Sequence, residues 1–409
     1  MQILFLAHRI PYPPDKGERI RAFQQLQYLG ARHDVDLFCF ADSKACARNQ
    51  EHLRTKCRSV HVEVLKKPSR LLRAASSFAG GQPISFGFFQ SPRFAQGLNR
   101  LLQTYKYDVI FVYSSSMGQY IPVPAPAPVV VDFVDADSQK FRQYAATANG
   151  FRARLYTREA DAVAGAERSL GHIAAVSLAV TRHDALELQN VIGSGCRVEV
   201  IPNGVQVPDC SSIDKQGVFA DLRPFLLFVG TMSYPPNADA AVYFAREILP
   251  LVHKTRPGMK FVIVGRDPDR RVRELASLPG VLVTGEVPDA FAYFRSADVT
   301  VAPFRISQGF HNKIAESLAL GTPVVTTARA RDGIGLSDRE GLFAADTPEE
   351  FTRQIEFALD PTVRRKVREN AGLVRKILSW DVSLAKLERL MMDAAAQSDT
   401  ATYRLAVGH

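Results

Sequence analysis

Short apolar runs alternate with helix-forming intervals along this chain, in two separate series. In order, the runs lie near residues 3–7, 35–40, 60–64, 109–113, 129–133, 175–180 and 198–201, and then near 225–230, 261–265, 281–284, 299–304, 324–327 and 342–345. Such alternation is typical of parallel β-sheets with helices on both faces. Residues 205–222, between the two series, are rich in turn residues and show no periodicity, so we interpret them as a linker.

The length of the chain also favours two domains, since 409 residues exceed what one hydrophobic core usually serves. We predict an α/β protein with two doubly wound domains, residues 1–206 and 207–378. Residues 379–409 are predicted to form an amphipathic helix that crosses back to the first domain, followed by a tail. Parallel sheets bind ligands at the carboxyl ends of their strands, so we expect the loops of the two domains to face each other across a cleft.

The composition is that of an ordinary globular protein, with 46% hydrophobic and 23% charged residues. No stretch approaches the ~18–20 apolar residues that span a bilayer, and the apolar segment 1–7 is too short for a secretion signal. We therefore expect a cytoplasmic protein. The five cysteines are odd in number and show no C-x-x-C pair, which indicates neither a disulfide framework nor a zinc site.

The net charge of +9 is unevenly distributed. Between Arg54 and Arg73 there are seven Lys or Arg residues and one acid, and the apolar residues that follow are Phe78, Ile84, Phe86, Phe88 and Phe89. Basic residues beside exposed aromatic residues suit an anionic membrane surface, so segment 54–89 is a candidate for peripheral contact with the inner face of the plasma membrane. A solvated charged face next to core phenylalanines is the open alternative. Nucleic-acid binding is not indicated, because the basic residues follow no recognised binding module.

Residues 307–325, "SQGFHNKIAESLALGTPVV", give the clearest indication of a ligand site. The stretch lies between two apolar runs and is predicted to contain the helix of a strand–helix–strand unit. Gly309 removes a side chain where the chain enters this helix, so a ligand can approach amides that have no intrahelical partner. The helix dipole, Arg305 and Lys313 favour an anion there, and a diphosphate fits. The alternative is a glycine placed for turn geometry and a lysine on a solvated face.

The same stretch resembles the Glu-x7-Glu region of the family 4 glycosyltransferases, enzymes of the GT-B fold with two Rossmann-like domains. The resemblance implies that Glu316 binds the ribose hydroxyls of a nucleotide-sugar donor. It also implies that main-chain amides of the turn Gln308–Asn312, which includes Phe310, bind the donor diphosphate. Gln308 stands where the family has its first Glu, which contacts the donor sugar; glutamine can hydrogen-bond hydroxyls but brings no charge.

The pattern R-x3-G-x2-N-K-x2-E-x2-A-x-G-x-P-V-V over residues 305–325 is similar to one branch of this family, the sugar transferases associated with exopolysaccharide export systems of the PEP-CTERM/EpsH type. The resemblance extends over nearly the whole chain, through "AHRIPYPPDKGERIRAF", "FVGTMSYPPNADA", "FVIVGRDP", "VTGEVPD" and the region of Trp380. Further donor-site candidates that it implies are Gly17, Arg21, Gly230, Arg266 and Glu286.

The family's common Gly-Arg…Lys pair, which clamps donor phosphates, is absent from the "FVGTMSYPPN" stretch. Arg305 and Lys313 are expected to replace it, since both cations suit phosphate oxygens. The turn around Glu286 is where the family reads the nucleobase, largely through backbone groups. For the loop that holds Gly17 and Arg21, the alternative is a proline-rich turn that precedes a helix.

The stretch "VVVDFVDADS" places Asp132, Asp135 and Asp137 at the end of a strand. A hard cation would require several further oxygen ligands, so no metal site is expected. We predict instead that one carboxylate orients an acceptor hydroxyl or the reacting sugar, as a His at the corresponding place does in many members of the family. Asp135 is the first choice and Asp132 the second. Helix N-capping is the alternative for Asp137 or Ser138.

Two further polar residues are given structural roles. His8 follows the first apolar run, and a lone histidine there is interpreted as a structural residue. Asn237 precedes apolar residues with one-face helical spacing, so it is interpreted as the N-cap of a scaffold helix.

Together these observations predict a glycosyltransferase that needs neither metal nor cofactor and transfers a sugar from a nucleotide-diphosphate donor to a lipid-linked or polysaccharide acceptor. The resemblance implies retention of configuration. Two alternatives remain open. One is a nucleotide-sugar 2-epimerase, which would require paired acid and base carboxylates around the sugar, and Gln308 argues against it. The other is a catalytically idle nucleotide-sugar-binding scaffold or sensor, for which Gln308 is the main support.

Overall fold

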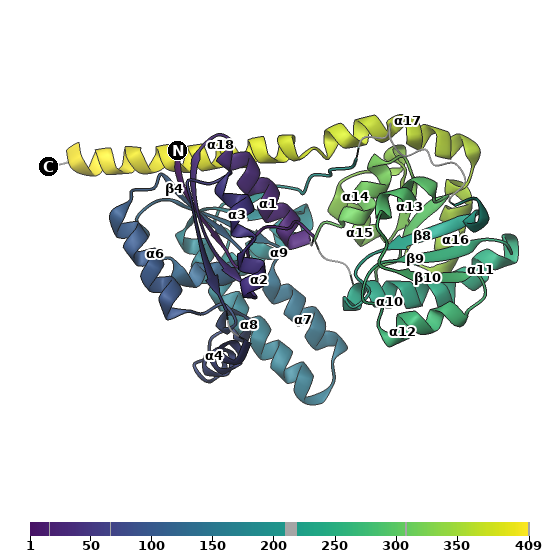
Figure 1. The fold of residues 1–409 in the computed structure, drawn as a ribbon, viewed down its shortest axis with the longest axis horizontal. Coiled ribbons are helices and arrows are strands. Elements are labelled where there is room, and N and C mark those ends of the chain that lie inside the picture. The colour runs from purple at the N-terminus through teal and green to yellow at the C-terminus, as the bar shows by residue number, and fades with distance from the viewer. Residues whose placement is uncertain (16, 66, 209–218, 307–308, 408–409) are drawn as a thin grey trace. The chain divides into compact units, whose positions relative to one another are not determined.

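The computed structural model describes residues 1–15, 17–65, 67–208, 219–306 and 309–407 (Figure 1). Its contacts divide the chain into two compact units. Unit 1 comprises Met1–Pro202 together with Ser383–His409, and unit 2 comprises Asn203–Val382. The domain boundaries expected from the sequence, 206/207 and 378/379, lie within a few residues of these.

Unit 1 contains a parallel sheet in the order β3-β2-β1-β4-β5-β6-β7. Its strands are β1 (Gln2–Ala7), β2 (Asp34–Ala41), β3 (Ser59–Val64), β4 (Val109–Tyr113), β5 (Val129–Val134), β6 (Ala174–Ala179) and β7 (Val198–Val200). Every residue from Ile3 to Ala7 is buried, so both faces of this central strand are covered. That is the expected environment of a continuous apolar run in a parallel sheet.

The helices of unit 1 connect these strands. They are α1 (Gly17–Gly30), α2 (Lys44–Ala47), α3 (Gln50–Arg54), α4 (Lys67–Ala79), α5 (Ile84–Gly87), α6 (Pro92–Thr104), the 3-10 helix η1 (Ser115–Tyr120), α7 (Asp137–Thr147), α8 (Gly150–Ile173) and α9 (Arg182–Ile192). The long C-terminal helix α18 (Trp380–Val407) packs on the same unit. Its Glu388 accepts a hydrogen bond from Tyr28 at 3.0 Å, and its Lys386 lies 2.9 Å from Glu199.

Unit 2 contains a second parallel sheet in the order β10-β9-β8-β11-β12-β13. Its strands are β8 (Phe225–Val229), β9 (Lys260–Val264), β10 (Val281–Gly285), β11 (Val299–Ala302), β12 (Val324–Thr326) and β13 (Leu342–Ala344). Its helices are η3 (Ala220–Leu222), α10 (Pro235–Tyr243), the π-helical turn η4 (Phe244–Ile248), α11 (Leu249–Thr255), α12 (Arg270–Glu274), η5 (Leu275–Ser277), α13 (Ala290–Ser296), α14 (Asn312–Ala319), α15 (Ala328–Ile334), η6 (Asp338–Glu340), α16 (Pro348–Ala358) and α17 (Pro361–Ile377).

Each apolar run named from the sequence has its strand, so the prediction of two doubly wound parallel sheets is confirmed. The basic segment 54–89 contains both exposed and buried aromatic side chains, whereas exposed ones were expected. Phe78 is 47% exposed, but Phe86 is buried, and Phe89 packs edge-on against His8. Arg58 forms an ion pair with Asp36. The expected row of exposed aromatic residues is therefore wrong, although Phe78 itself is exposed.

No helix in the described part of the chain is long and apolar enough to cross a membrane. The described cysteines Cys39, Cys46, Cys57 and Cys196 are free thiols. Cys210 lies outside the described residues.

Candidate functional site

The candidate donor residues of unit 2 lie at the carboxyl edge of its sheet. Strands β8 and β11 are neighbours in the sheet but not in the chain, so the connections after them lead to opposite sides. Ligands of open parallel sheets bind at such a switch point. The loop after β8 contains Gly230, and the loop after β11 leads through Gly309 into α14.

Lys313 connects the two loops. Its half-buried ammonium group donates a hydrogen bond of 2.7 Å to Asn237 Oδ1 and lies 4.8 Å and 4.9 Å from the ring centroids of Phe228 and Phe304. Among the described residues, no carboxylate lies within ion-pair distance of it. Burial lowers the pKa of Lys313 to about 7. A cation in this state is stabilised by any anion that reaches it.

Asn237 was missed as a site residue by the sequence analysis, and its interpretation as a helix N-cap is wrong. Helix α10 begins at Pro235 with Tyr234 as N-cap, so Asn237 lies inside the first turn. Its amide nitrogen donates to Thr231 O at 3.0 Å, which leaves the amide oxygen to accept from Lys313. No motif marks such a residue; the signal in the sequence is a polar residue that falls within the apolar face of a helix.

Glycines let the loops approach each other closely. A Cβ at Gly230 would lie 2.8 Å from both Lys313 Nζ and Asn237 Nδ2. At Gly265, which follows β9, a Cβ would lie 1.6 Å from Gly230 O. Distances below about 3 Å cannot be accommodated without movement, so a side chain is excluded at positions 230 and 265.

The entrance of α14 suits an anion. Gly309 has a φ of 68°, a conformation that favours glycine, and the N-cap His311 provides no side-chain cap within the described residues. The His311 ring stacks on Phe304 at 4.3 Å, and burial lowers the pKa of His311 to about 3, so this imidazole is neutral. The uncapped amides of the first turn and the helix dipole both favour negative charge here. Gln308 lies outside the described residues.

Glu316 lies three residues after Lys313, on the same face of α14. It is half-buried, and burial raises the pKa of its carboxyl group to about 7. Within the described residues nothing donates a hydrogen bond to this carboxylate. It is thus an acceptor held close to a cation without a hydrogen-bond donor of its own.

The other donor candidates of unit 2 are more dispersed. Arg305 is 56% exposed and donates through Nε to Asp239 at 3.0 Å, so its charge already has a carboxylate partner. Asn312 opens α14 and accepts a hydrogen bond from Asn203 at 3.4 Å, while Phe310 packs against the core of the unit. Arg266 follows β9, and its carbonyl accepts from Met232 N. The exposed Glu286 follows β10.

In unit 1, Arg21 and Asp132 form a buried ion pair. Arg21 Nε donates to Asp132 at 2.8 Å, and the two side chains are 1% and 0% exposed. Gln25 donates to the same carboxylate, and Arg21 also donates to Ile201 O at 2.9 Å. Neither group is presented to solvent in this arrangement, so the ion pair stabilises the interior of unit 1. Donor binding by Arg21 and catalysis by Asp132 stay predictions. Gly17, by contrast, is exposed at the start of α1.

Asp135 directly follows a strained residue. Val134 has a φ of 69°, which is unusual for a β-branched residue and turns the chain sharply after β5. Asp135 is half-buried, and burial raises its pKa to about 7, while the nearby Lys140 acts in the opposite direction. A carboxyl group that titrates near neutrality is suited to proton transfer or to binding a hydroxyl. Asp132 and Asp135 therefore lie in different environments, the first in a buried ion pair and the second half-buried.

The neighbouring polar residues are held by ion pairs and by a helix contact. Asp137 pairs with Lys140, and no group of three or more His, Cys, Asp or Glu side chains in the described part of the chain is arranged to hold a metal ion. The N-cap of α7 is Ala136, so N-capping by Asp137 or Ser138 is wrong. Instead, Glu167 of α8 accepts from Ser138 N at 3.2 Å and from Ser138 Oγ at 2.5 Å, and so fixes the first turn of α7.

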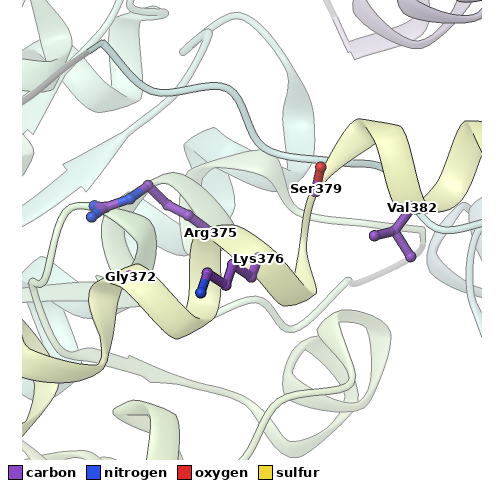
Figure 2. Close-up of a pocket in the computed structure, with 5 residues that line it drawn as sticks. All are labelled: Gly372, Arg375, Lys376, Ser379 and Val382. Atoms are coloured by element: carbon purple, nitrogen blue, oxygen red, sulfur yellow. The ribbon is translucent and has the colours of Figure 1, made fainter.

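A cavity of about 550 Å³ in unit 2 lies elsewhere (Figure 2). It is lined by Gly372, Arg375, Lys376, Ser379 and Val382. Arg375 donates to Ala319 O at 2.7 Å, at the last residue of α14, whereas Lys313 is near the first. At 1.5 Å per residue these ends are roughly 10 Å apart, so this cavity is distinct from the candidate donor site.

Two family descriptions match the chain in the order of its two units. Residues 17–204 match "Glycosyl transferase 4-like domain", and residues 223–360 match "Glycosyl transferases group 1". The matches leave uncovered only residues 1–16, 205–222 and 361–409. The chain belongs to the glycosyltransferases of GT-B fold.

Individual members of this family resemble the chain over different lengths. Phosphatidyl-myo-inositol mannosyltransferases of Mycobacterium leprae and Mycolicibacterium smegmatis are each 33% identical to it over 131 residues. The match spans 31% of this chain and about a third of each mannosyltransferase, 34% and 33% respectively.

Solved structures resemble the chain over nearly its full length. Sucrose-phosphate synthase of Thermosynechococcus elongatus has a TM-score of 0.70 at 16% identity and covers 97% of this chain and 99% of its own. HepE of Anabaena, in complex with UDP, has a TM-score of 0.66 at 16% identity, with 96% and 100% covered. WaaG, a glycosyltransferase involved in lipopolysaccharide biosynthesis, has a TM-score of 0.61 at 17% identity, with 95% and 99% covered. At these identities the likeness shows the fold.

Proposed function

We propose that unit 2 binds a nucleotide-diphosphate sugar and that the protein transfers the sugar to an acceptor. The observation that supports this most is the half-buried Lys313 ammonium group, which contacts an amide oxygen and two aromatic rings but no carboxylate among the described residues. A half-buried cation at a helix entrance attracts a phosphate group. The related HepE structure contains UDP, and a further HepE structure contains UDP-glucose.

Each part of the site has a proposed role. Lys313 and the amides from Gly309 to Asn312 bind the diphosphate, and Glu316 accepts hydrogen bonds from the ribose hydroxyls. Gly230 keeps space open for the phosphates beside Lys313. Charge that builds on the departing diphosphate is then stabilised by groups already in place, which lowers the barrier to transfer. Gln308, which stands outside the described residues, is proposed to contact the donor sugar.

We further propose that Asp135 orients the acceptor hydroxyl or the reacting sugar, with no metal and no cofactor required. We also propose that the transfer retains the configuration of the sugar. The proposed acceptor is a lipid-linked molecule or a polysaccharide in exopolysaccharide synthesis. The support for such an acceptor is indirect: the mannosyltransferase relatives are named for phosphatidyl-myo-inositol, and WaaG for lipopolysaccharide biosynthesis. A protein with an acceptor of this kind would work at the inner face of the plasma membrane.

A panel of nucleotide sugars tests the proposal. The protein is incubated with each donor, in EDTA and in added Mg²⁺, and the products are separated by mass spectrometry. We expect slow hydrolysis of one donor or a few related donors to the nucleoside diphosphate, at the same rate in both buffers. Failure of every donor to bind or react would reject the function, whereas turnover that requires Mg²⁺ would reject the metal-independent mechanism.

A further inference from the structure

Helix α4 of unit 1 directs its large apolar side chains outward. Ala74 and Ser77 face inward and are 5% and 7% exposed, whereas Leu71, Leu72 and Phe78 are 67%, 74% and 47% exposed. A helix that only contributes to a core buries its large apolar residues instead. The inward face is closely packed, since a Cβ at Gly87 of α5 would lie 2.8 Å from Ala74 Cα. The leucines of α4 therefore cannot be accommodated on that side.

Helix α8 is fixed beside this exposed face. Arg158 Nη2 donates to Phe78 O at 2.7 Å, and the guanidinium group lies 4.3 Å from the centroid of the Phe78 ring. The next residue, Glu159, accepts hydrogen bonds from Ile84 N and Ser85 N, both at 2.8 Å. Figure 1 shows α7 and α8 side by side, extending beyond the strands of unit 1, with α4 next to α8. The two elements thus form one continuous part of the surface.

The tip of the α7–α8 hairpin continues the apolar face. Phe151, in the first turn of α8, is 78% exposed. Phe151, Leu155 and Arg158 are spaced i, i+4 and i+7, so they lie on one face of the helix and lead from the tip back to Phe78. We call Leu71, Leu72, Phe78 and Phe151 together the docking surface. Contiguous apolar groups of this kind on a monomer mark an interaction site.

The tip of the α7–α8 hairpin is basic. Residues 138–158 contain five Lys or Arg and no acid, namely Lys140, Arg142, Arg152, Arg154 and Arg158. Arg152 and Arg154 are exposed, next to Phe151 in the sequence. Glu159 is turned inward at 3% exposure, Asp161 lies 3.8 Å from Arg142, and Asp137 pairs with Lys140. The partner is therefore expected to be anionic and to accept apolar side chains.

We propose that the docking surface binds a lipid bilayer that contains anionic lipids. Leucine and phenylalanine side chains insert at the level of the headgroups, and the surrounding arginines contact lipid phosphates. A second copy of this chain is disfavoured as occupant, because it would bring two arrays of like charge together. Nucleic acid would satisfy the arginines but leave the leucines in water. The inference does not depend on the glycosyltransferase reaction, since no donor-site residue takes part.

Co-sedimentation with vesicles tests the proposal. Vesicles of phosphatidylcholine mixed with phosphatidylglycerol should bind the protein, and vesicles of phosphatidylcholine alone should bind it much more weakly. Leu71→Gln and Phe151→Ser should each weaken binding about tenfold, as expected for the loss of one buried apolar side chain. Arg152→Gln together with Arg154→Gln should weaken it about 30-fold, since each cation near such a surface contributes about fivefold.

Matched variants control for general effects. Leu186 of α9 is 66% exposed, close to the value for Leu71, and Leu186→Gln should not change vesicle binding. Arg100→Gln with Lys106→Gln removes two exposed cations of α6 and the segment that follows it, and should have little effect. All variants should bind nucleoside diphosphate as the wild type does, which separates this proposal from the proposed function.

Two results would overturn the inference. One is equal sedimentation of the wild type and the docking-surface variants with phosphatidylglycerol vesicles. The other is a dimer seen by light scattering without lipid that Leu71→Gln dissociates, because the docking surface would then belong to a second copy of the chain.

Discussion

Burial makes the environment of the Lys313 ammonium group less favourable for charge than water. One amide oxygen and two aromatic faces solvate it, and burial brings its pKa to about 7. A bound phosphate group would bring a further negative charge beside Lys313 and raise this pKa again. Part of the binding energy of an anion therefore comes from relieving the unfavourable burial of this charge in the protein without ligand.

The two aspartates near the end of β5 provide a test at the scale of single residues. Asp132→Asn removes the charge that compensates the buried Arg21, and breaking such a pair costs about 3–5 kcal/mol, so thermal unfolding should shift down by several degrees. Asp135→Asn should change the unfolding temperature much less, because this carboxyl group is half-buried, has no buried ion-pair partner like Arg21 among the described residues, and is about half protonated at pH 7. It should lower turnover by about 10²–10⁴-fold, as expected for a residue that acts on the reacting groups.

Differential scanning fluorimetry and donor turnover, measured on both variants, distinguish these roles. An Asp132→Asn variant that is as stable as the wild type would show that the pair is not structural. Full turnover by Asp135→Asn would remove Asp135 from the proposed reaction.

At the scale of elements, the loops after β8 and β9 depend on glycine for their close approach. Gly230→Ala would place a methyl group 2.8 Å from Lys313 Nζ and Asn237 Nδ2, so at least one of them must move. We expect nucleoside diphosphate binding to weaken about tenfold, with a loss of stability of about 1 kcal/mol. Gly258→Ala is the matched control in the same unit, because a Cβ there meets nothing within 4 Å. Equal affinity of the two variants, measured by calorimetry, would show that the space beside Lys313 is not used.

The strands could be predicted from this sequence because periodic apolar runs depend on local sequence alone. The same is true of the helix after β11, which is predicted between two such runs and observed as α14. Side-chain partners could not be predicted in this way. The pairing of Arg21 with Asp132 joins residues 111 positions apart, and the contact between Lys313 and Asn237 spans 76 positions.

The exposed face of α4 was also only partly foreseen. Its basic and apolar residues are visible in the sequence, but which of them face outward depends on the packing of Ala74 and Ser77 against α5. The contribution of the α7–α8 tip arises from the contact between Arg158 and Phe78, two residues from different elements. Such contacts depend on tertiary structure, which single-sequence patterns do not encode.

At the scale of the whole molecule, both units have the same doubly wound design, with a switch point between β1 and β4 in unit 1 and between β8 and β11 in unit 2. The two family matches divide along the same lines. The proposed donor site uses the switch point of unit 2, and the proposed membrane contact uses helices of unit 1. Nucleotide binding and lipid binding are therefore expected to be separable by mutation.

The central claim is that Lys313 and Glu316 bind the diphosphate and the ribose of a nucleotide. Lys313→Met should weaken the binding of a nucleoside diphosphate by about 10- to 100-fold and that of the matching nucleoside by much less, because only the diphosphate carries the charge. Glu316→Ala should weaken the binding of both ligands, because both contain ribose. Lys376→Met, which removes an exposed cation lining the cavity of Figure 2, is the control and should bind both ligands as the wild type does.

Isothermal titration of the wild type and Lys313→Met with the diphosphate at pH 8, in two buffers of different ionisation enthalpy, tests this claim most directly. In the protein without ligand the pKa of Lys313 is about 7, so this side chain is mostly neutral at pH 8. A bound diphosphate that raises the pKa therefore causes Lys313 to take up a proton. We predict proton uptake approaching one per site for the wild type and none at this site for Lys313→Met, together with the loss of affinity. Unchanged affinity in Lys313→Met, or equal proton uptake by both proteins, would contradict the account.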